Sequence, residues 1–179
     1  MIVDGTNIHE FLNDDGTILD CTNFGVASLM IPDTCTELKK IDCFDNQLAI
    51  LIIPDTCAEL QEINCCHNQL TSLTIPDTCT KLKMIDCSHN QLTTLKIQDA
   101  CTELIIIYCH NNHLTSLIIP GTITKLGWMT CDEIKFILVL CSHKFIISIN
   151  REDTYTYHKE QTKKYFLVCS LLKDLRSFC

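Results

Sequence analysis

The sequence predicts a mostly β member of the α/β class, a solenoid with short parallel strands on its concave face and an extended or 3₁₀ convex side. One observation is a block of 22 residues that begins at residues 29, 51, 73 and 95, with nine positions identical in all four copies. One such unit cannot bury its own apolar face, so the copies must stack on one another. Another is the alternation in Ile41-Asp42-Cys43, whose period of two is that of a strand.

The range over which the 22-residue repeat holds predicts three segments of the chain. Residues 1–15 carry apolar side chains among polar ones and are expected to form an N-terminal cap. Residues 16–134 form the repeat array, of about six repeats, because Leu19 upstream and Met129 downstream keep the phase of the clear copies. Residues 135–179 lose the period and are expected to be a C-terminal strand/helix cap or a separate interaction segment.

Within this last segment, residues 135–149 predict two strands or a hairpin, and residues 150–156 predict a surface turn. Residues 160–178 predict a helix, because apolar residues recur at helical spacing among Lys and Arg. Such a stripe favours a cap that shields the last repeat. A helix that docks on a partner protein is the alternative.

Cysteines occupy fixed positions of the repeat. Fourteen of them would ordinarily suggest a disulfide framework or metal sites, but ten fall in two positions of the repeat. These positions form one set of Cys21, Cys43, Cys65, Cys87, Cys109 and Cys131 and another of Cys35, Cys57, Cys79 and Cys101. A free cysteine is a small, easily buried apolar residue, so we interpret both sets as reduced ladders inside the solenoid. Reduced thiols are typical of the cytosol and predict a cytoplasmic protein.

The charge balance bears on the partners. A net charge of −8 argues against nucleic acid or an anionic membrane as the main partner, because both attract a basic surface. The first residues lack the basic start and apolar stretch of a secretory signal. No apolar run approaches the roughly 20 residues that a membrane-spanning helix needs. We therefore expect a soluble chain that binds neither nucleic acid nor membrane.

Each copy contains the pattern LxxLxLxxNxL, which in the first copy is Leu38, Ile41, Cys43, Asn46 and Leu48. This pattern resembles the leucine-rich repeat. The other half of the unit, IPDTCTEL, is similar to FNIP-type repeats of 22 residues, although the FN dipeptide of that family is absent. The resemblance implies a binding module that presents its concave face. Arrays of this kind resemble those of amoebae, their large viruses and some bacteria, so a viral or effector protein is one version of the hypothesis.

The asparagine of this pattern is expected to be structural. It recurs at the bend that follows each strand, as Asn46, Asn68, Asn90 and Asn112. Backbone groups in such a bend have no ladder partners, and a stacked asparagine can satisfy them. On the convex side, proline fits an extended path, and one turn of 3₁₀-helix is expected at residues 33–37.

The strand positions that point outward predict the binding surface. Met84, Ile106, Tyr108 and Trp128 gather on adjacent strands of the C-terminal half. Tyr and Trp are favoured anchors of protein interfaces, and an exposed apolar cluster with a polar rim is typical of a contact site. Asp42 and Asp86 are expected to act as electrostatic selectors, with Phe44 in a neighbouring column. The alternative is that the C-terminal segment folds over the apolar group.

Zinc binding and nucleophilic catalysis are two alternative functions that the Cys and His residues suggest. Cys66, His67, His89 and His110 could hold zinc, but a nearly flat sheet makes tetrahedral closure difficult, and solvated histidines are the preferred interpretation. The pairs Cys66/His67, Cys109/His110 and Cys141/His143 suggest nucleophilic catalysis. Adjacent residues on a strand face opposite sides, so the first two pairs cannot easily meet within one repeat, and no pattern marks the third group that would orient a catalytic pair. We expect no catalytic residue, no cofactor and no metal.

The sequence therefore predicts a non-enzymatic protein–protein interaction module that presents a concave surface to a protein partner. One alternative is a substrate-recruiting subunit of a larger enzyme assembly such as a ubiquitin ligase. Another is a structural protein that self-associates.

Overall fold

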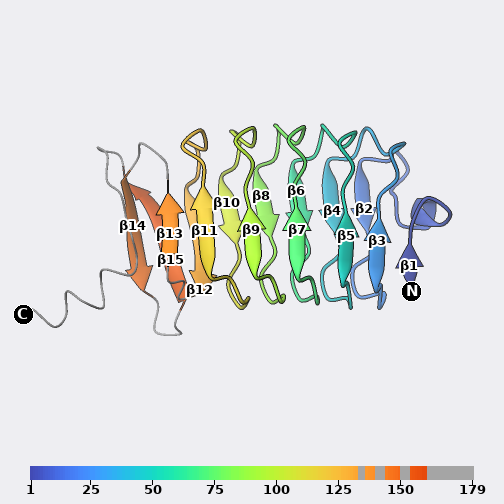
Figure 1. The fold of residues 1–179 in the computed structure, drawn as a ribbon. Helices are drawn as coiled ribbons and strands as arrows, with labels where there is room; N and C mark the ends of the chain where they lie inside the picture. Colours follow the sequence, from blue (N-terminus) through green and yellow to red (C-terminus); the bar gives the residue numbers. More distant parts are fainter. Residues whose placement is uncertain (133–135, 140–143, 150–153, 161–179) are drawn as a thin grey trace, which may run out of the picture.

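The computed structural model describes residues 1–132, 136–139, 144–149 and 154–160. The chain winds into a solenoid in which nearly every element is a short strand, and successive turns stack along one axis (Figure 1). Among the described residues, no helix is long and apolar enough to cross a membrane.

One side of the solenoid is an eight-stranded sheet, which we call the long sheet. Its repeat strands pair in parallel, and each residue pairs with the residue 22 positions further along the chain, such as Ile41 with Ile63. These strands are β2 (Ile18–Asp20), β4 (Lys40–Asp42), β6 (Glu62–Asn64), β8 (Met84–Asp86), β10 (Ile106–Tyr108) and β12 (Trp128–Asp132). The predicted parallel strands are confirmed, at the predicted positions.

The opposite side consists of two shorter parallel sheets, which we call the return sheets. The first contains β1 (Ile2–Val3), β3 (Ser28–Met30) and β5 (Ile50–Ile52). The second contains β7 (Ser72–Thr74), β9 (Thr94–Lys96), β11 (Ser116–Ile119) and β13 (Phe136–Val139). The extended path expected here is therefore also a paired sheet, interrupted between β5 and β7.

The single 3₁₀ turn expected at residues 33–37 is not formed. Instead, the Cys35 amide donates to the Pro32 carbonyl at 3.0 Å in an isolated turn, and the chain then descends to the buried Leu38. Pro32 fixes the start of this turn, and the inward Cys35 side chain ends it before a second helical bond can form. In the described part of the chain, the 3₁₀-helix is η1 (Ile8–Glu10), in the N-terminal segment.

The core is one continuous cluster between the two sides. The middle residue of each three-residue strand points inward and its neighbours point outward, as in Lys40-Ile41-Asp42. Burial of each Leu or Ile stabilises the fold by about 1.5–3 kcal/mol before the loss of chain entropy is counted. Both cysteine ladders lie in this core as free thiols.

The asparagine ladder joins consecutive turns at the bends that follow β4, β6, β8 and β10. The Asn68 Oδ1 accepts the Leu48 amide at 2.9 Å, and its Nδ2 donates to the Cys43 carbonyl at 2.9 Å and the Cys65 carbonyl at 3.1 Å. Asn46, Asn90 and Asn112 make the equivalent bonds in their own turns. The geometry is that of the structural role expected for these side chains.

The N-terminal residues cover the first edge of the long sheet. The Asp20 amide donates to the Phe11 carbonyl and the Asn13 amide to the Ile18 carbonyl, both at 2.9 Å, on either side of an antiparallel bridge between Leu12 and Leu19. Ile8 and Phe11 are buried against the first turn. This edge of β2 is therefore paired rather than open.

Two strands lie within residues 135–149, as expected, but they join different sheets and do not pair as a hairpin. β13 pairs in parallel with β11, so the second return sheet continues past the expected boundary at residue 134. β14 (Lys144–Ile149) pairs antiparallel with β15 (Thr154–Glu160), and β15 pairs antiparallel with β12. Residues 154–156 are thus strand rather than turn. The helix expected over residues 160–178 lies outside the described residues, apart from Glu160 at the end of β15.

Candidate functional site

The apolar residues expected as anchors lie together on the outer face of the long sheet. Strand register places Met84 beside Ile106 and Ile106 beside Trp128, with Tyr108 two residues along β10. Adjacent strands lie about 4.8 Å apart, so these side chains span about 10 Å. Trp128 is 37% exposed, and Met84, Ile106 and Tyr108 are half-buried. We call these four residues the anchor group.

The described C-terminal strands do not lie over the anchor group. β15 continues the long sheet edge to edge, with His158 opposite Trp128. A strand that pairs with β12 in the plane of the sheet continues the sheet rather than forming a second layer on it. The described backbone of β15 therefore does not fold over these side chains, and Trp128 keeps an exposed fraction of 37%.

Asp42 and Asp86 also lie on the outer face, but their Oδ1 atoms serve the fold. The Asp86 Oδ1 accepts the Ser88 amide at 3.0 Å, and the Asp42 Oδ1 accepts the Thr22 hydroxyl at 3.3 Å. The Asp42 Oδ2 lies 3.1 Å from the Lys40 Nζ. An Asp or Asn that binds the amide two residues ahead closes the end of a strand. Sequence reasoning missed this role, although Asp or Asn in one position of successive repeats was a usable signal.

The column that contains Phe44 is less open than expected. Phe44 is 37% exposed, but Cys66 and Ser88 are only 7% and 2% exposed. The Ser88 Oγ lies within hydrogen-bonding distance of the Cys66 Sγ, at 3.0 Å, and of the Asp86 Oδ1, at 2.6 Å. Cys66 and Ser88, which follow Phe44 in this outward column at the 22-residue spacing, are covered because equivalent side chains of adjacent turns pack against each other.

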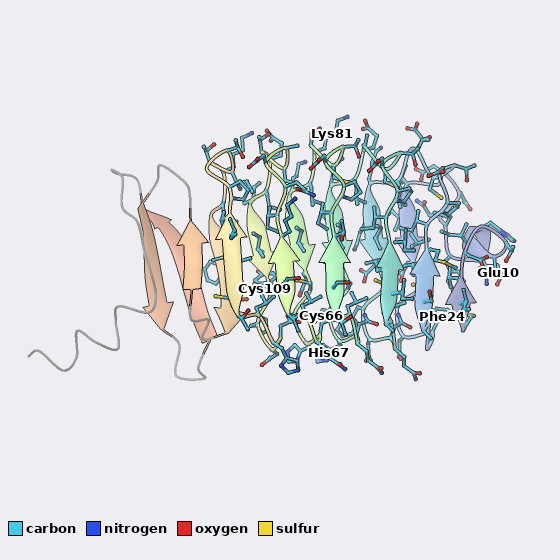
Figure 2. All side chains as sticks on the ribbon, in the orientation of Figure 1. Glu10, Phe24, Cys66, His67, Lys81 and Cys109 are labelled. Atoms are coloured by element: carbon cyan, nitrogen blue, oxygen red, sulfur yellow. The ribbon has the colours of Figure 1, made fainter. Side chains whose placement is uncertain are left out.

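The histidines lie where the chain leaves the long sheet. His67 and His89 adopt left-handed backbone, with φ of 54° and 52°, and their rings stack with centroids 4.0 Å apart. Phe44 and His110 flank this pair edge-on. Figure 2 shows His67 at this edge of the solenoid, with Lys81 at the opposite edge. Over the described residues, no group of three or more His, Cys, Asp or Glu could hold a metal ion.

The described Cys–His pairs do not have the geometry of a nucleophile and its base. Cys109 is fully buried and its Sγ donates to the Thr130 carbonyl at 3.2 Å, whereas the His110 Nδ1 lies 2.8 Å from the Thr130 Oγ1. Burial raises the pKa of Cys66, which disfavours its thiolate. The pair Cys141/His143 lies outside the described residues.

The comparisons with known proteins identify the repeats. A family model described as leucine-rich repeats, in two copies, matches residues 58–100. No curated protein sequence matches. A solved structure, described as the functional domain of InlJ from Listeria monocytogenes that includes a cysteine ladder, is similar over 65% of this chain, with 18% identity and a TM-score of 0.42. The chain spans 34% of that structure's length, and the likeness is too distant to bear on function. The FNIP-type similarity stays an expectation.

Proposed function

We propose that this chain, whose residues 58–100 are leucine-rich repeats, is a non-enzymatic module that binds a protein partner on the outer face of the long sheet. Leucine-rich repeats are a general protein-interaction module. The observation that carries the proposal is the anchor group, because it presents a tryptophan and a tyrosine beside two apolar residues on a paired sheet.

Rigidity of the long sheet supports this function. Its strands are hydrogen-bonded in register from β2 to β12, and the asparagine ladder fixes the bends after β4, β6, β8 and β10. A surface that is already ordered loses little conformational entropy when a partner binds. The anchor side chains are therefore presented in a fixed arrangement, and specificity comes from their positions.

One observation supports the absence of catalysis, and another supports a reducing compartment. Burial raises the pKa of the ladder thiols, for example that of Cys21 to about 12 and that of Cys79 to about 12, so they stay protonated. Cysteines held in apolar ladders as free thiols are typical of the cytoplasm. Neither a recruiting role in a ubiquitin-ligase-like assembly nor self-association is favoured by a specific contact among the described residues, and both stay as alternatives.

The test is affinity capture from lysate with three forms of the full chain: wild type, Tyr108→Ala/Trp128→Ala and Ile50→Ala/Ile52→Ala. Ile50 and Ile52 are 50% and 49% exposed on the first return sheet, so the third form removes comparable apolar surface from the other side. Circular dichroism first establishes that all three are folded. We expect a partner that the Tyr108/Trp128 variant loses and the Ile50/Ile52 variant keeps, confirmed by calorimetry with the purified partner. Equal capture by all three forms would contradict the proposal.

A further inference from the structure

The outer face of the long sheet changes character along the solenoid axis. The anchor group occupies the strands β8, β10 and β12. The strands β2 and β4, with the bend after β4 and the end of β8, carry four carboxylates that we call the acidic strip: Asp20, Asp42, Asp45 and Asp86. The two parts adjoin, because strand register pairs Asp86 with Tyr108.

Few positive charges offset the acidic strip. Lys40 lies on the same face and pairs with Asp42 at 3.1 Å. In the described structure, Asp20, Asp45 and Asp86 have no salt bridge, and neither has Glu62, which faces outward on β6. The columns that contain the acidic strip hold Asp, Asn, Thr, His and Tyr but neither Lys nor Arg within the described turns.

We propose that the partner presents a segment with an aromatic or aliphatic residue at one end and several Lys or Arg along the rest, laid across the strands. This inference rests on the proposed function and specifies the chemistry of its partner. The apolar end covers the anchor group, and the basic part runs over Asp86 and Asp42 toward Asp20.

The dimensions suit a short segment. The outer face from β12 to β2 covers five strand spacings, which is about 24 Å. An extended peptide rises about 3.3 Å per residue, so about seven residues cross the face. Such a segment places basic side chains near each carboxylate of the acidic strip while its apolar end contacts Trp128.

Charge complementarity excludes other partner chemistries. An acidic segment or a nucleic-acid backbone would lie against like charges, and such juxtapositions are costly even when partly solvated. Opposite charges at the rim of an apolar contact raise the rate of association and select the partner, whereas the buried apolar residues provide most of the affinity.

The test begins with selection from a displayed library of random 12-residue peptides on the immobilised full chain. We expect the recovered peptides to combine an aromatic or aliphatic residue with a cluster of Lys or Arg. The most enriched peptide is then labelled, and its dissociation constant is measured by fluorescence anisotropy against wild type and three double variants.

The first double variant, Asp42→Asn/Asp86→Asn, removes charge but keeps the turn-closing oxygen. Asn64 occupies the same position naturally and its Oδ1 accepts the Cys66 amide at 3.3 Å, so this variant should fold. Its matched control is Asp33→Asn/Asp77→Asn, exposed carboxylates with the same spacing along the chain on the turns that follow the return sheets. We expect the first variant to weaken binding about three- to tenfold and the control to stay within about twofold. Raising NaCl from 0.05 M to 0.5 M should weaken wild-type binding in the same range.

The third double variant, Tyr108→Ala/Trp128→Ala, separates this inference from the proposed function. Recovery of acidic or uncharged peptides would overturn the partner chemistry and leave the proposed function standing. The same conclusion would follow if the dissociation constant is unchanged in Asp42→Asn/Asp86→Asn but binding is lost in Tyr108→Ala/Trp128→Ala. Binding that ignores Tyr108→Ala/Trp128→Ala, or a selection that enriches no peptide, would overturn both.

Discussion

The two sides of the solenoid are made from the same 22-residue unit, yet they differ in continuity. The long sheet is unbroken from β2 to β12, whereas the return side divides between β5 and β7. The bends after β4, β6, β8 and β10 are each tied by an asparagine whose side chain bonds to backbone groups of two turns, whereas the bend before a long-sheet strand contains a turn such as Pro32–Cys35. These buried or half-buried amide bonds distinguish the long sheet from the opposite side, where links between turns include the exposed Lys81–Glu59 salt bridge.

The cysteine ladders show the same contrast. Burial raises the pKa of Cys43 and Cys87, in the long-sheet ladder, well above the ordinary value of a thiol. In the ladder of Cys35, Cys57, Cys79 and Cys101, which we call the return ladder, burial raises the pKa of Cys57 to about 11 and that of Cys79 to about 12. Cys57 should therefore ionise before Cys43 and Cys87.

The largest expected effect is loss of the fold at alkaline pH. Thiols in an unfolded chain titrate near pH 8.5, well below the folded values of about 11 for Cys57 and about 12 for Cys21. Above pH 8.5 the folded state therefore binds more protons than the unfolded state. The stability that the protonated thiols contribute is complete below pH 8.5 and declines as the pH rises toward the folded pKa values. Each protected thiol lowers the free energy of unfolding by about 1.4 kcal/mol per pH unit in that window.

We expect circular dichroism to show cooperative unfolding between about pH 9 and pH 11, reversed when the pH is lowered. Labelling with iodoacetamide before the transition, followed by mass spectrometry, should modify Cys57 before Cys43 and Cys87. A melting temperature that is constant from pH 7.5 to pH 10, or labelling in the opposite order, would contradict the contrast between the ladders.

The next effect concerns the asparagine ladder. Asn90→Ala removes bonds to the Leu70 amide and to the Cys65 and Cys87 carbonyls, and it leaves buried backbone groups unpaired. We expect the free energy of unfolding to fall by about 1–3 kcal/mol. Thr94→Ala, at an exposed position on a return sheet of the same turn, should change it by less than about 0.5 kcal/mol. Urea denaturation measures both, and equal midpoints for the two variants would show that the asparagine ladder is not what orders the long sheet.

An effect of similar size compares the inner and outer faces of the long sheet. Cys65→Ser places a hydroxyl in the apolar core and should destabilise by about 1–3 kcal/mol. Cys66→Ser should change stability by less than about 0.5 kcal/mol, because the Cys66 Sγ already lies 3.0 Å from the Ser88 hydroxyl. Thermal melts compare the two variants. A larger loss with Cys66→Ser would mean that its column belongs to the core.

The smallest effect lies on the return side. Lys81 and Glu59 form a salt bridge at 2.6 Å between adjacent turns, with side chains 52% and 35% exposed. Lys81→Ala should destabilise by no more than about 0.5–1 kcal/mol, and less at 0.5 M NaCl. Urea midpoints at two salt concentrations measure it. A salt-independent loss above about 1 kcal/mol would show that side-chain links between turns matter as much here as on the long sheet.

These contrasts show which features of the fold follow from sequence. The strands at Ile41, Ile63 and Ile85 and the asparagine ladder were predictable, because each depends on a residue pattern repeated at a fixed spacing. The burial of Cys66 and Ser88 was not, because alternation within a strand does not show how neighbouring turns cover each other. Asp42 and Asp86 were recognised as outward-facing, but not as acceptors within their own turns.

The C-terminal strands were the least predictable part. β15 pairs with β12 in the opposite direction to the repeats, through residues that carry no period. Pairing of this kind depends on contacts between segments distant in sequence, and an apolar run such as residues 136–139 does not specify which sheet it joins. The anchor group could be named from sequence, but the orientation of the strand beside Trp128 could not.

The bonds of the asparagine ladder also have a consequence for how the protein can change in length. Asn68 bonds to Leu48 and Cys43, and Asn90 bonds to Leu70 and Cys65, so every link reaches back one turn and no further. Deleting or duplicating one whole unit of 22 residues, such as 51–72, restores identical partners at the new junction. A gene that encodes this array can therefore gain or lose repeats by recombination within the reading frame, and each event widens or narrows the binding face by about 4.8 Å without any compensating substitution.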